Sequence, residues 1–367
     1  MLLNLTILPG DGIGPEVTEQ AVLVLQAIAG AFGHELRLQR KNIGGAALTA
    51  SNDPLPADTL QACLSSSAVL LGAVGSPAFD HYPNHLRPEA GLLRLRRELG
   101  AFANLRPAIC FPALEDCSPL RSDLVRGTDI MIVRELLGGL YFGEPRSITG
   151  EAGHRVATNT MTYAEPAIER IARVAFDLAT KRRKKVLSVD KANVLECSRL
   201  WREVVTRCAK DYSGIQLSHQ YVDSAAMLLV QRPRDFDVVL TENMFGDILS
   251  DQAGGVVGSL GLLASASIGG PVGVYEPVHG SAPDIAGKGV ANPLGAILSA
   301  ALLLRHSFQL DREAGCIESA VRAVLDRGSR TADLVRGKEA AASTSRMGNQ
   351  VIEAAKELGA EAKRKSA

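Results

Sequence analysis

The sequence predicts an α/β protein with two domains and parallel or mixed sheets, and three observations support this prediction. The chain has 367 residues, which is more than one ordinary domain needs. Apolar residues make up 46% of the chain, so it can fill large hydrophobic cores. Apolar runs typical of buried strands alternate with helical patterns at residues 5–8, 15–29, 56–67 and 68–74. Such alternation is typical of a parallel sheet.

The composition argues against several classes of partner. The 40 Lys and Arg residues balance the 40 Asp and Glu residues, so the charge gives no reason to expect binding to nucleic acid or to a membrane. The longest apolar run, residues 296–304, is far shorter than the ~18 residues of a membrane span. The short apolar start lacks the basic segment of a signal peptide. The six cysteines form no C-x-x-C pair, so we expect reduced thiols in a cytoplasmic protein.

Two aspartates four residues apart are the first candidates for a metal site. Asp247 and Asp251 follow an apolar run at 237–240 that is typical of a buried strand, and they lie in a stretch with helical spacing. On a helix their Cβ atoms lie roughly 5–6 Å apart, and two carboxylates so close repel each other unless a positive charge lies between them. They suit Mg²⁺ or Mn²⁺, which take oxygen ligands. The alternative is one aspartate favoured by the helix dipole beside a solvated one. Asp223, after the strand predicted at 216–222, lies at a similar junction and strengthens the metal interpretation.

Arginines inside apolar strands are candidates for binding an acidic substrate. Arg106 and Arg134 lie in runs that are typical of strands, and a buried guanidinium requires an anion. Arg96, on the helix predicted at 91–99, could join them, and three convergent arginines would suit a small di- or tricarboxylate. The alternative is that each arginine forms a structural salt bridge.

Three loops and one turn carry further candidates. Lys191 follows the strand predicted at 186–190, a position suited to cleft chemistry, although a surface lysine is the plainer interpretation. The glycine-rich turn at 10–14 could hold a phosphate at a helix start. Its G-x-G-x-G spacing differs from the dinucleotide fingerprint, however, and favours a tight turn. The loop at 76–88 is of a kind usually kept for function, and Asp284 could accept hydrogen bonds from a ribose.

The remaining patterns concern organisation. Residues 138–146 and 155–163 predict an extended hairpin that could serve as a dimer arm. The Gly- and Ser-rich residues 254–273 indicate a crossing between domains. A continuously apolar helix is predicted at 294–308, in a deep core or a subunit interface.

Taken together, these motifs resemble the β-decarboxylating 2-hydroxyacid dehydrogenases. The resemblance covers nearly the whole chain and rests on LPGDGIGPE at 8–16, GLL at 91–93, FANLRP at 102–107, VREL at 133–136, YFGE at 141–144, DKANV at 190–194, NMFGDILSDQAGG at 243–255 and HGSAPDIAG at 279–287. It implies an oxidoreductase that binds NAD without a Rossmann fold and uses Mg²⁺ or Mn²⁺, with K⁺ as a further candidate activator. It also implies an obligate homodimer with active sites shared between subunits, and a glycine turn that is structural.

The resemblance implies a role for each domain. Domain one, residues 1–101 and 258–367, would hold both termini and the NAD-binding loops. Domain two, residues 102–257, would hold the dimerisation surface, the arm, and the metal and catalytic residues. The residues that match NAD contacts are Ser76, Glu89, Asn193, His279, Gly280, Ser281, Ala282, Asp284, Ile285 and Asn292. The pair Asp284–Ile285 matches the NAD-using members, because NADP-using relatives place Lys-Tyr there.

The resemblance also assigns the chemistry and the metal. Lys191 and Tyr141 match the acid/base pair of the family. Asp247 and Asp251 match the metal ligands of one subunit, and Asp223 matches the ligand that the other subunit contributes next to the substrate.

The substrate contacts follow in the same way. Arg96, Arg106 and Arg134 match the arginines that hold the malate carboxylates. Leu92, together with Val194 of the partner subunit, matches the pocket for an isopropyl group.

Three hypotheses for the reaction follow. The first is NAD-dependent oxidation and decarboxylation of (2R,3S)-3-isopropylmalate to 4-methyl-2-oxopentanoate and CO₂, in leucine biosynthesis. The second is another 3-substituted malate, tartrate, malate, isocitrate or homoisocitrate as substrate, although the apolar pair Leu92–Leu93 disfavours a charged substituent. The third is a non-catalytic nucleotide- or phosphate-binding module built on the glycine turn, which would leave Lys191, Tyr141 and the three aspartates without a task.

Four positions depart from the family pattern. Gln252 stands where Glu is usual, Leu137 replaces a common Thr, Ser224 a common Asn, and Ala264 a common Pro. These departures are the main argument for the second hypothesis.

Overall fold

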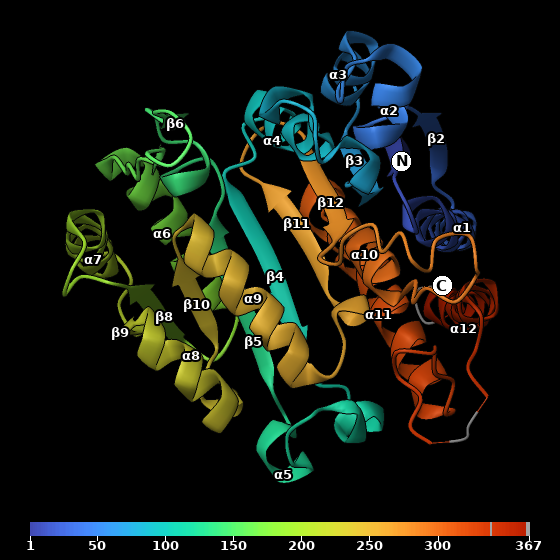
Figure 1. Ribbon diagram of the computed structural model, residues 1–367. Coiled ribbons are helices and arrows are strands. Elements are labelled where there is room, and N and C mark those ends of the chain that lie inside the picture. Colours follow the sequence, from blue (N-terminus) through green and yellow to red (C-terminus); the bar gives the residue numbers. More distant parts are fainter. Residues whose placement is uncertain (338–339, 365–367) are drawn as a thin grey trace. The chain divides into compact units, whose positions relative to one another are not determined.

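The computed structural model describes residues 1–337 and 340–364, and it contains two compact units. Unit 1 comprises Met1–Ala101, Phe111–Pro119 and Val257–Ala367, and unit 2 comprises Phe102–Cys110 and Leu120–Val256. In each unit strands and helices alternate along the chain, as Figure 1 shows, and this confirms the predicted α/β class.

The sheet of unit 1 is mainly parallel. Its strands are β1 (Leu2–Gly10), β2 (Glu35–Arg40), β3 (Ala68–Ala73), β11 (Ala264–Ile268) and β12 (Gly273–Pro277). They lie in the order β2-β1-β3-β12-β11, and only the pairing of β11 with β12 is antiparallel among those described. β11 lies within the predicted domain crossing. Its Ser265 and Ser267 are buried, so packing rather than an apolar pattern determines this strand.

The helices of unit 1 lie close to the predicted positions, apart from a short helix at Gly44–Ser51 that was not predicted. They are α1 (Gly14–Phe32), α2 (Gly44–Ser51), α3 (Ala57–Leu64), α4 (Pro88–Glu98), α10 (Leu294–Phe308), α11 (Asp311–Asp326) and α12 (Thr344–Arg364). At the start of α10, Leu294 N donates to Asn292 Oδ1 over 3.0 Å, and α1, α10, α11 and α12 pack on one another. The last few residues of the chain are rich in lysine, and we expect them to be frayed. Residues 365–367 lie outside the described part of the chain.

The sheet of unit 2 is also mainly parallel, with one antiparallel pair among those described. Its strands are β4 (Ala103–Ile109), β5 (Asp129–Glu135), β8 (Lys185–Asp190), β9 (Gln216–Tyr221) and β10 (Val238–Thr241). They lie in the order β4-β5-β10-β8-β9, and β5, β10, β8 and β9 are parallel while β4 is antiparallel to β5. The helices are α5 (Ser122–Val125), α6 (Glu165–Thr180), α7 (Glu196–Ala209), α8 (Val222–Gln231) and α9 (Asn243–Val257).

The predicted hairpin is shorter than the sequence indicates. The antiparallel pair is β6 (Ser147–Thr149) with β7 (Val156–Thr158), and Gly139–Tyr141 form a 3₁₀ turn instead of a strand. Gly139 has a φ of 73°, and a Cβ there would lie 2.5 Å from the hydroxyl oxygen of Tyr163. The turn that presents Tyr141 therefore depends on this glycine.

Parallel pairing places the important strand ends of unit 2 at one edge of its sheet. Arg134 on β5 is in register with Thr241 at the end of β10, and Asp190 at the end of β8 is in register with Tyr221 at the end of β9. Segments that follow parallel strands at their carboxyl ends commonly form ligand sites. Among the described residues, no helix is both long and apolar enough to cross a bilayer.

The cysteines agree with the expected reduced thiols. None of the six is in a disulfide bond; five are buried, and Cys197 is partly exposed.

Candidate active site

The aspartates of α9 lie beside two arginines. Asp247 Oδ1 forms an ion pair with Arg134 Nη1 and lies 3.4 Å from Arg106 Nη1. Asp251 Oδ1 lies 3.5 Å from the same nitrogen of Arg106. The structure therefore brings together two predicted metal ligands and two predicted substrate-binding arginines within unit 2.

Both arginines are buried and held in place by side-chain acceptors. Arg134, which is 2% exposed, donates from Nε and Nη2 to Asn243 Oδ1 over 3.0 and 2.7 Å. Arg106, which is 7% exposed, donates to Asn104 Oδ1 and Ser250 Oγ, each over 2.7 Å. Because these contacts fix the guanidinium planes, the arginines are prepared for an anion of defined geometry.

A glycine lets α9 approach the arginines. A Cβ at Gly246 would lie 2.7 Å from Arg134 Cγ, so a larger residue would push the helix away from this arginine. Asn243 at the start of α9 also donates from Nδ2 to the carbonyl oxygens of Leu136 and Gly138, over 3.1 and 3.0 Å. The same asparagine therefore orients Arg134 and fixes the turn that leads to Tyr141.

Tyr141 contacts the same aspartate. Its hydroxyl donates to Asp247 Oδ2 over 2.8 Å, and the ring centroid lies 5.6 Å from Arg134 Cζ. Burial and the hydrogen bond to Asp247 raise the pKa of Tyr141 to about 12. The phenol thus keeps its proton at neutral pH, as a general acid must.

Lys191 and Asp223 form a separate pair. Lys191 Nζ donates to Asp223 Oδ1 over 2.9 Å, and this bond lowers the pKa of Asp223. Asp223 lies in the first turn of α8 and its side chain is 66% exposed. No group of three His, Cys, Asp or Glu residues that could hold a metal occurs within residues 1–337 and 340–364. The predicted ligands of one chain are therefore divided between two places.

The donor set of α9 fits part of a divalent-metal site. Burial would raise the pKa of Asp247, but the charges of Arg134 and Arg106 outweigh it and the pKa is lowered. Burial raises the pKa of Asp251, with Asp247 adding to the effect and Arg106 opposing it. The surroundings of Asp251 thus disfavour its negative charge. A hard cation shared with Asp247 would stabilise that charge. Two carboxylates would fill only part of the octahedral shell of Mg²⁺, which usually keeps several waters and takes substrate oxygens as well.

In unit 1 the predicted substrate residues lie on α4. Arg96 is buried and donates from Nη2 to Glu276 Oε1 over 2.7 Å. This contact is a salt bridge of the kind that the alternative interpretation of Arg96 describes. Arg94, which has no assigned role, forms an ion pair with Asp53 at 3.0 Å. Leu92 is partly buried and packs against the hydrophobic core of unit 1.

Parts of the predicted NAD loops meet at Gly75, just after β3. A Cβ at Gly75 would lie 3.3 Å from Glu89 Oε1 and 3.4 Å from Ser281 Oγ, so these two side chains face the same backbone. Their neighbour Ser76 is partly buried, and Asp284 is exposed.

The other predicted NAD residues have varied surroundings. Gly280 is exposed and its carbonyl oxygen lies 2.9 Å from His279 Nδ1, and burial lowers the pKa of His279. Ala282 has a φ of 40°, and its carbonyl accepts a hydrogen bond from Ile285 N over 3.1 Å. Asn292 Nδ2 donates to an aspartate carboxylate over 2.9 Å. Asn193 belongs to unit 2, where it and Val194 are exposed in the turn after Lys191.

The glycine-rich turn packs tightly against the backbone of neighbouring segments. A Cβ at Gly10 or Gly12 would collide with the carbonyl oxygen of Ala73 or Ser281, respectively. The carboxylate of Asp11 accepts hydrogen bonds from the backbone of Gly45, Ala46 and Gly75 over 2.8–2.9 Å. These contacts support the tight-turn interpretation. The three backbone N–H groups already donate to Asp11, so they are not available to a phosphate.

A family model described as isocitrate/isopropylmalate dehydrogenase matches residues 4–351. The chain belongs to this family. Curated relatives named 3-isopropylmalate dehydrogenase include one from Priestia megaterium, 56% identical, with 92% of each chain covered. Another, from Halalkalibacterium halodurans, is 53% identical with 96% of this chain and 97% of the relative covered. A crystal structure of isocitrate dehydrogenase from Methylococcus capsulatus has a TM-score of 0.86 and 36% identity, with 96% and 99% coverage.

Two of the departures from the family pattern have side-chain hydrogen bonds within unit 2. Gln252 Nε2 donates to the carbonyl oxygen of Ala226 over 2.8 Å, so it joins α9 to α8. Ser224 Oγ accepts from Gln220 Nε2 over 2.5 Å. Gln252 therefore helps to hold α9 against α8.

Two supporting asparagines of this family member were missed by sequence reasoning. Asn104 is two residues before Arg106 on β4, so both point to the same face of the strand. A fully buried asparagine in an apolar strand next to an arginine was the available signal. Asn243 is the first residue of α9. Asparagine is common at helix starts because it caps them, so its presence there gave no sign of a further role.

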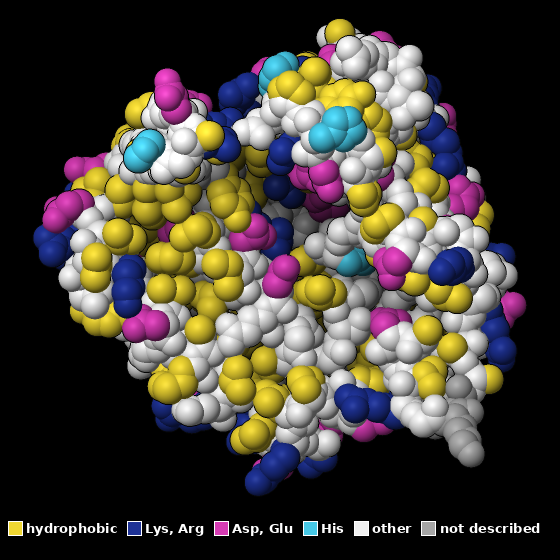
Figure 2. Space-filling model, viewed as in Figure 1, with side chains coloured by type: hydrophobic (Ala, Val, Ile, Leu, Met, Phe, Trp, Pro, Cys, Tyr) yellow, Lys and Arg dark blue, Asp and Glu magenta, His cyan; other side chains and the backbone are white. Residues whose placement is uncertain are grey.

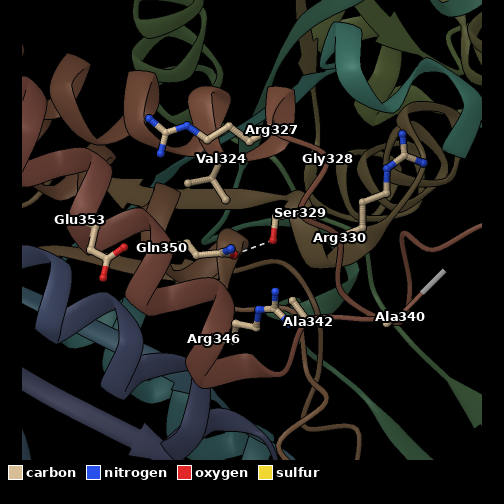
Figure 3. Close-up of a pocket in the computed structure, with 10 residues that line it drawn as sticks. All are labelled: Val324, Arg327, Gly328, Ser329, Arg330, Ala340, Ala342, Arg346, Gln350 and Glu353. Carbon is tan, nitrogen blue, oxygen red and sulfur yellow. Dashed lines mark hydrogen bonds between the residues drawn. The ribbon is translucent and has the colours of Figure 1, made fainter.

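A pocket in unit 1 is separate from all predicted site residues. Figure 3 shows this pocket of ≈ 280 Å³ at the start of α12, with Arg327, Arg330 and Arg346 around it. Ser329 Oγ donates to Gln350 Oε1 over 2.5 Å within it. Arg330 is paired with Asp116 and Arg327 with Glu357, so most of this positive charge is already compensated.

Proposed function

We propose that this chain is a cytoplasmic dehydrogenase that oxidises and decarboxylates 3-isopropylmalate with NAD and Mg²⁺ or Mn²⁺, in leucine biosynthesis. The observation that carries the proposal is the contact of buried Arg106 and Arg134 with Asp247 and Asp251. A substrate with two carboxylates together with a divalent cation would complement this set of two positive and two negative groups. The relatives named 3-isopropylmalate dehydrogenase, at 53–56% identity, support the same reaction.

The residues of the chain supply binding and proton transfer. Arg106 and Arg134 would hold a malate carboxylate, and Arg96 is a further candidate for substrate binding. Lys191 would take the proton of the substrate hydroxyl as a hydride leaves C2, and Tyr141 would protonate C3 after CO₂ has left. A divalent cation on Asp247 and Asp251 would stabilise negative charge on the substrate oxygens.

The cofactor would be held by the loops of unit 1. When bound, NAD would supply the acceptor for the hydride of C2. Glu89, Ser281 and Asp284 present oxygen acceptors suited to ribose and amide groups, and an acidic residue is the usual partner of a ribose hydroxyl in NAD sites. K⁺ would act as an accessory activator.

The alkyl substituent distinguishes the substrate from isocitrate. Leu92 and Leu93 are partly buried on α4 and offer an apolar surface. Placing a third carboxylate against them would cost several kcal/mol unless a cation accompanied it. The two leucines therefore favour an isopropyl group.

We propose that the active form is a homodimer. Exposed apolar side chains gather on α8 and α9, where Met227 is 51% exposed, Val230 38% and Ile248 59% (Figure 2). The β6–β7 hairpin adds Ile148 and Val156, both at least 60% exposed. A contiguous apolar patch of this kind commonly marks a subunit interface. In such a dimer Lys191 and Asp223 of one subunit would complete the Asp247–Asp251 site of the other.

Disrupting this surface is expected to remove activity without touching the metal residues. Met227→Glu places a charge on α8, which should shift the protein to monomers in sedimentation velocity and lower kcat in parallel. Leu64→Glu, at an exposed leucine of α3 in unit 1, is the control and should remain dimeric and active. A fully active monomer of Met227→Glu would contradict the shared site.

The reaction itself is tested by a substrate panel. NADH formation with Mn²⁺ is measured with 3-isopropylmalate, isocitrate, malate and tartrate, and with NADP in place of NAD. We expect the highest kcat/KM with 3-isopropylmalate and NAD. A higher value with isocitrate or tartrate would replace the substrate assignment. No turnover with any member would exclude the dehydrogenase function.

A further inference from the structure

The turn that carries Lys191 is attached to α7 by an ion pair whose acidic partner is buried. Asp190 ends β8, and its side chain is 1% exposed. Arg202 on α7 donates from Nε to Asp190 Oδ2 over 2.8 Å and from Nη2 to Oδ1 over 2.9 Å. Such a two-point pair fixes the carboxylate in one plane, which a single hydrogen bond would not do.

The same carboxylate and a neighbouring serine hold the backbone of Lys191 on both sides. Ala192 N donates to Asp190 Oδ1 over 2.9 Å, and Lys191 N donates to the buried Ser198 Oγ over 3.0 Å. Ser198 belongs to α7, as does Arg202. Both peptide groups that flank the Lys191 Cα atom are therefore anchored to one helix.

The side chain of Lys191 is bordered by a residue that also contacts Arg202. Lys191 Nζ lies 5.9 Å from the ring centroid of Tyr221, and Arg202 Cζ lies 5.1 Å from the same centroid. Tyr221 pairs with Asp190 across β8 and β9. Arg202 thus contacts both Asp190, which holds the turn of Lys191, and Tyr221, which borders its side chain.

We infer that Arg202 is a positioning residue, which through Asp190 and Tyr221 holds Lys191 where it can accept the substrate's proton. The inference rests on the proposed function of Lys191. The Asp190 side chain is 1% exposed and the Arg202 side chain 34%, and such a pair is weak evidence for added stability. Its two-point geometry restricts orientation, so a geometric role explains it better. A displacement of a catalytic group by about 1 Å can cost 10²-fold in rate.

The test compares Arg202→Ala with wild type in the 3-isopropylmalate assay. We expect kcat to fall about 10- to 100-fold while KM for NAD and the affinity for Mn²⁺ stay near wild type. Arg202 lines an open groove of ≈ 640 Å³ together with Ala192, Thr206 and Tyr221, so small solutes can reach the space that alanine leaves. Added guanidinium ion, at concentrations that leave the fold intact, should restore part of kcat in Arg202→Ala and none in Lys191→Met.

The controls separate positioning from a merely structural effect. Arg207→Ala removes an arginine from the same helix and groove, where it pairs with Glu165, and should leave kcat unchanged. If Arg202→Ala fails to fold, Arg202→Lys decides, because lysine keeps the charge but not the two-point contact. If wild type is active and the folded Arg202 variant has the same kcat, this inference is overturned while the proposed function stands. An inactive wild type would overturn the proposed function and, with it, this inference.

Discussion

Replacing Lys191 with methionine is expected to lower kcat by about 10²- to 10⁴-fold, the usual contribution of a positioned acid or base. The lysine side chain is 27% exposed, and its Nζ donates to Asp223 over 2.9 Å. Methionine has a similar length and keeps the packing against Tyr221, but it cannot exchange a proton. The measurement is kcat for NADH formation from 3-isopropylmalate with Mn²⁺, together with circular dichroism of the variant.

A matched lysine controls for the loss of charge. Lys210→Met, at the exposed end of α7, removes one positive charge from the same unit and should keep kcat within about twofold, as surface changes usually do. The affinity of Lys191→Met for NAD should also stay unchanged, since no described contact joins Lys191 to the predicted NAD loops. Near-normal turnover of a folded Lys191→Met would rule out the assigned role.

The strand–helix junctions of the site could be predicted from the sequence. The apolar run before Asp247 and the spacing of Asp247 and Asp251 predict β10 followed by α9, and the structure has both. Arginines in apolar strands predicted Arg106 and Arg134 as buried cations that need anions. In each case the pattern is local. A buried charge also restricts the possible structures, because it requires an oppositely charged partner nearby.

The supporting contacts could not be predicted, because they join segments far apart in sequence. Asn243 is 109 residues from Arg134, and Ser250 is 144 residues from Arg106. Polar side chains such as these suit many environments, and only the packed fold pairs them. β11 is a further case, because its small polar residues carry no strand signal and its neighbour β12 determines the pairing.

The position of Asp223 could be predicted, but its role cannot be explained within one chain. Its carboxylate accepts from Lys191 and is 66% exposed, and the described groups of one chain form no three-ligand cluster. A site assembled from two subunits would account for both facts. This interpretation remains a prediction, and the Met227→Glu experiment tests it.

The two aspartates of α9 are expected to affect stability in opposite directions, although each is needed for metal binding. Asp247→Asn should lower the free energy of unfolding by about 1–3 kcal/mol, because buried Arg134 loses a charged acceptor and water can only partly replace it. Asp251→Asn should raise the stability of the metal-free protein at neutral pH, because burial and Asp247 disfavour its charge. Urea unfolding of both variants measures the two signs.

The pH dependence follows from the same pKa shifts. The native pKa of Asp247 is lowered from 3.8, so its contribution to stability is complete above about pH 4 and is lost as the pH falls through the native value. Asp247→Asn should therefore lose less stability on acidification than wild type. The native pKa of Asp251 is raised, so its cost is present at neutral pH and disappears as the pH falls toward 3.8.

Metal binding should reveal why a destabilising aspartate is present. Mn²⁺ is expected to stabilise wild type, by an amount that grows with the ratio of metal concentration to Kd. Both Asp247→Asn and Asp251→Asn should lose this stabilisation and the Mn²⁺-dependent turnover. Asp251→Asn would then be more stable than wild type without metal, yet inactive. An Asp251→Asn protein that is still stabilised by Mn²⁺ would show that Asp251 is not a ligand, and the raised pKa would then reflect only its crowded position beside Asp247.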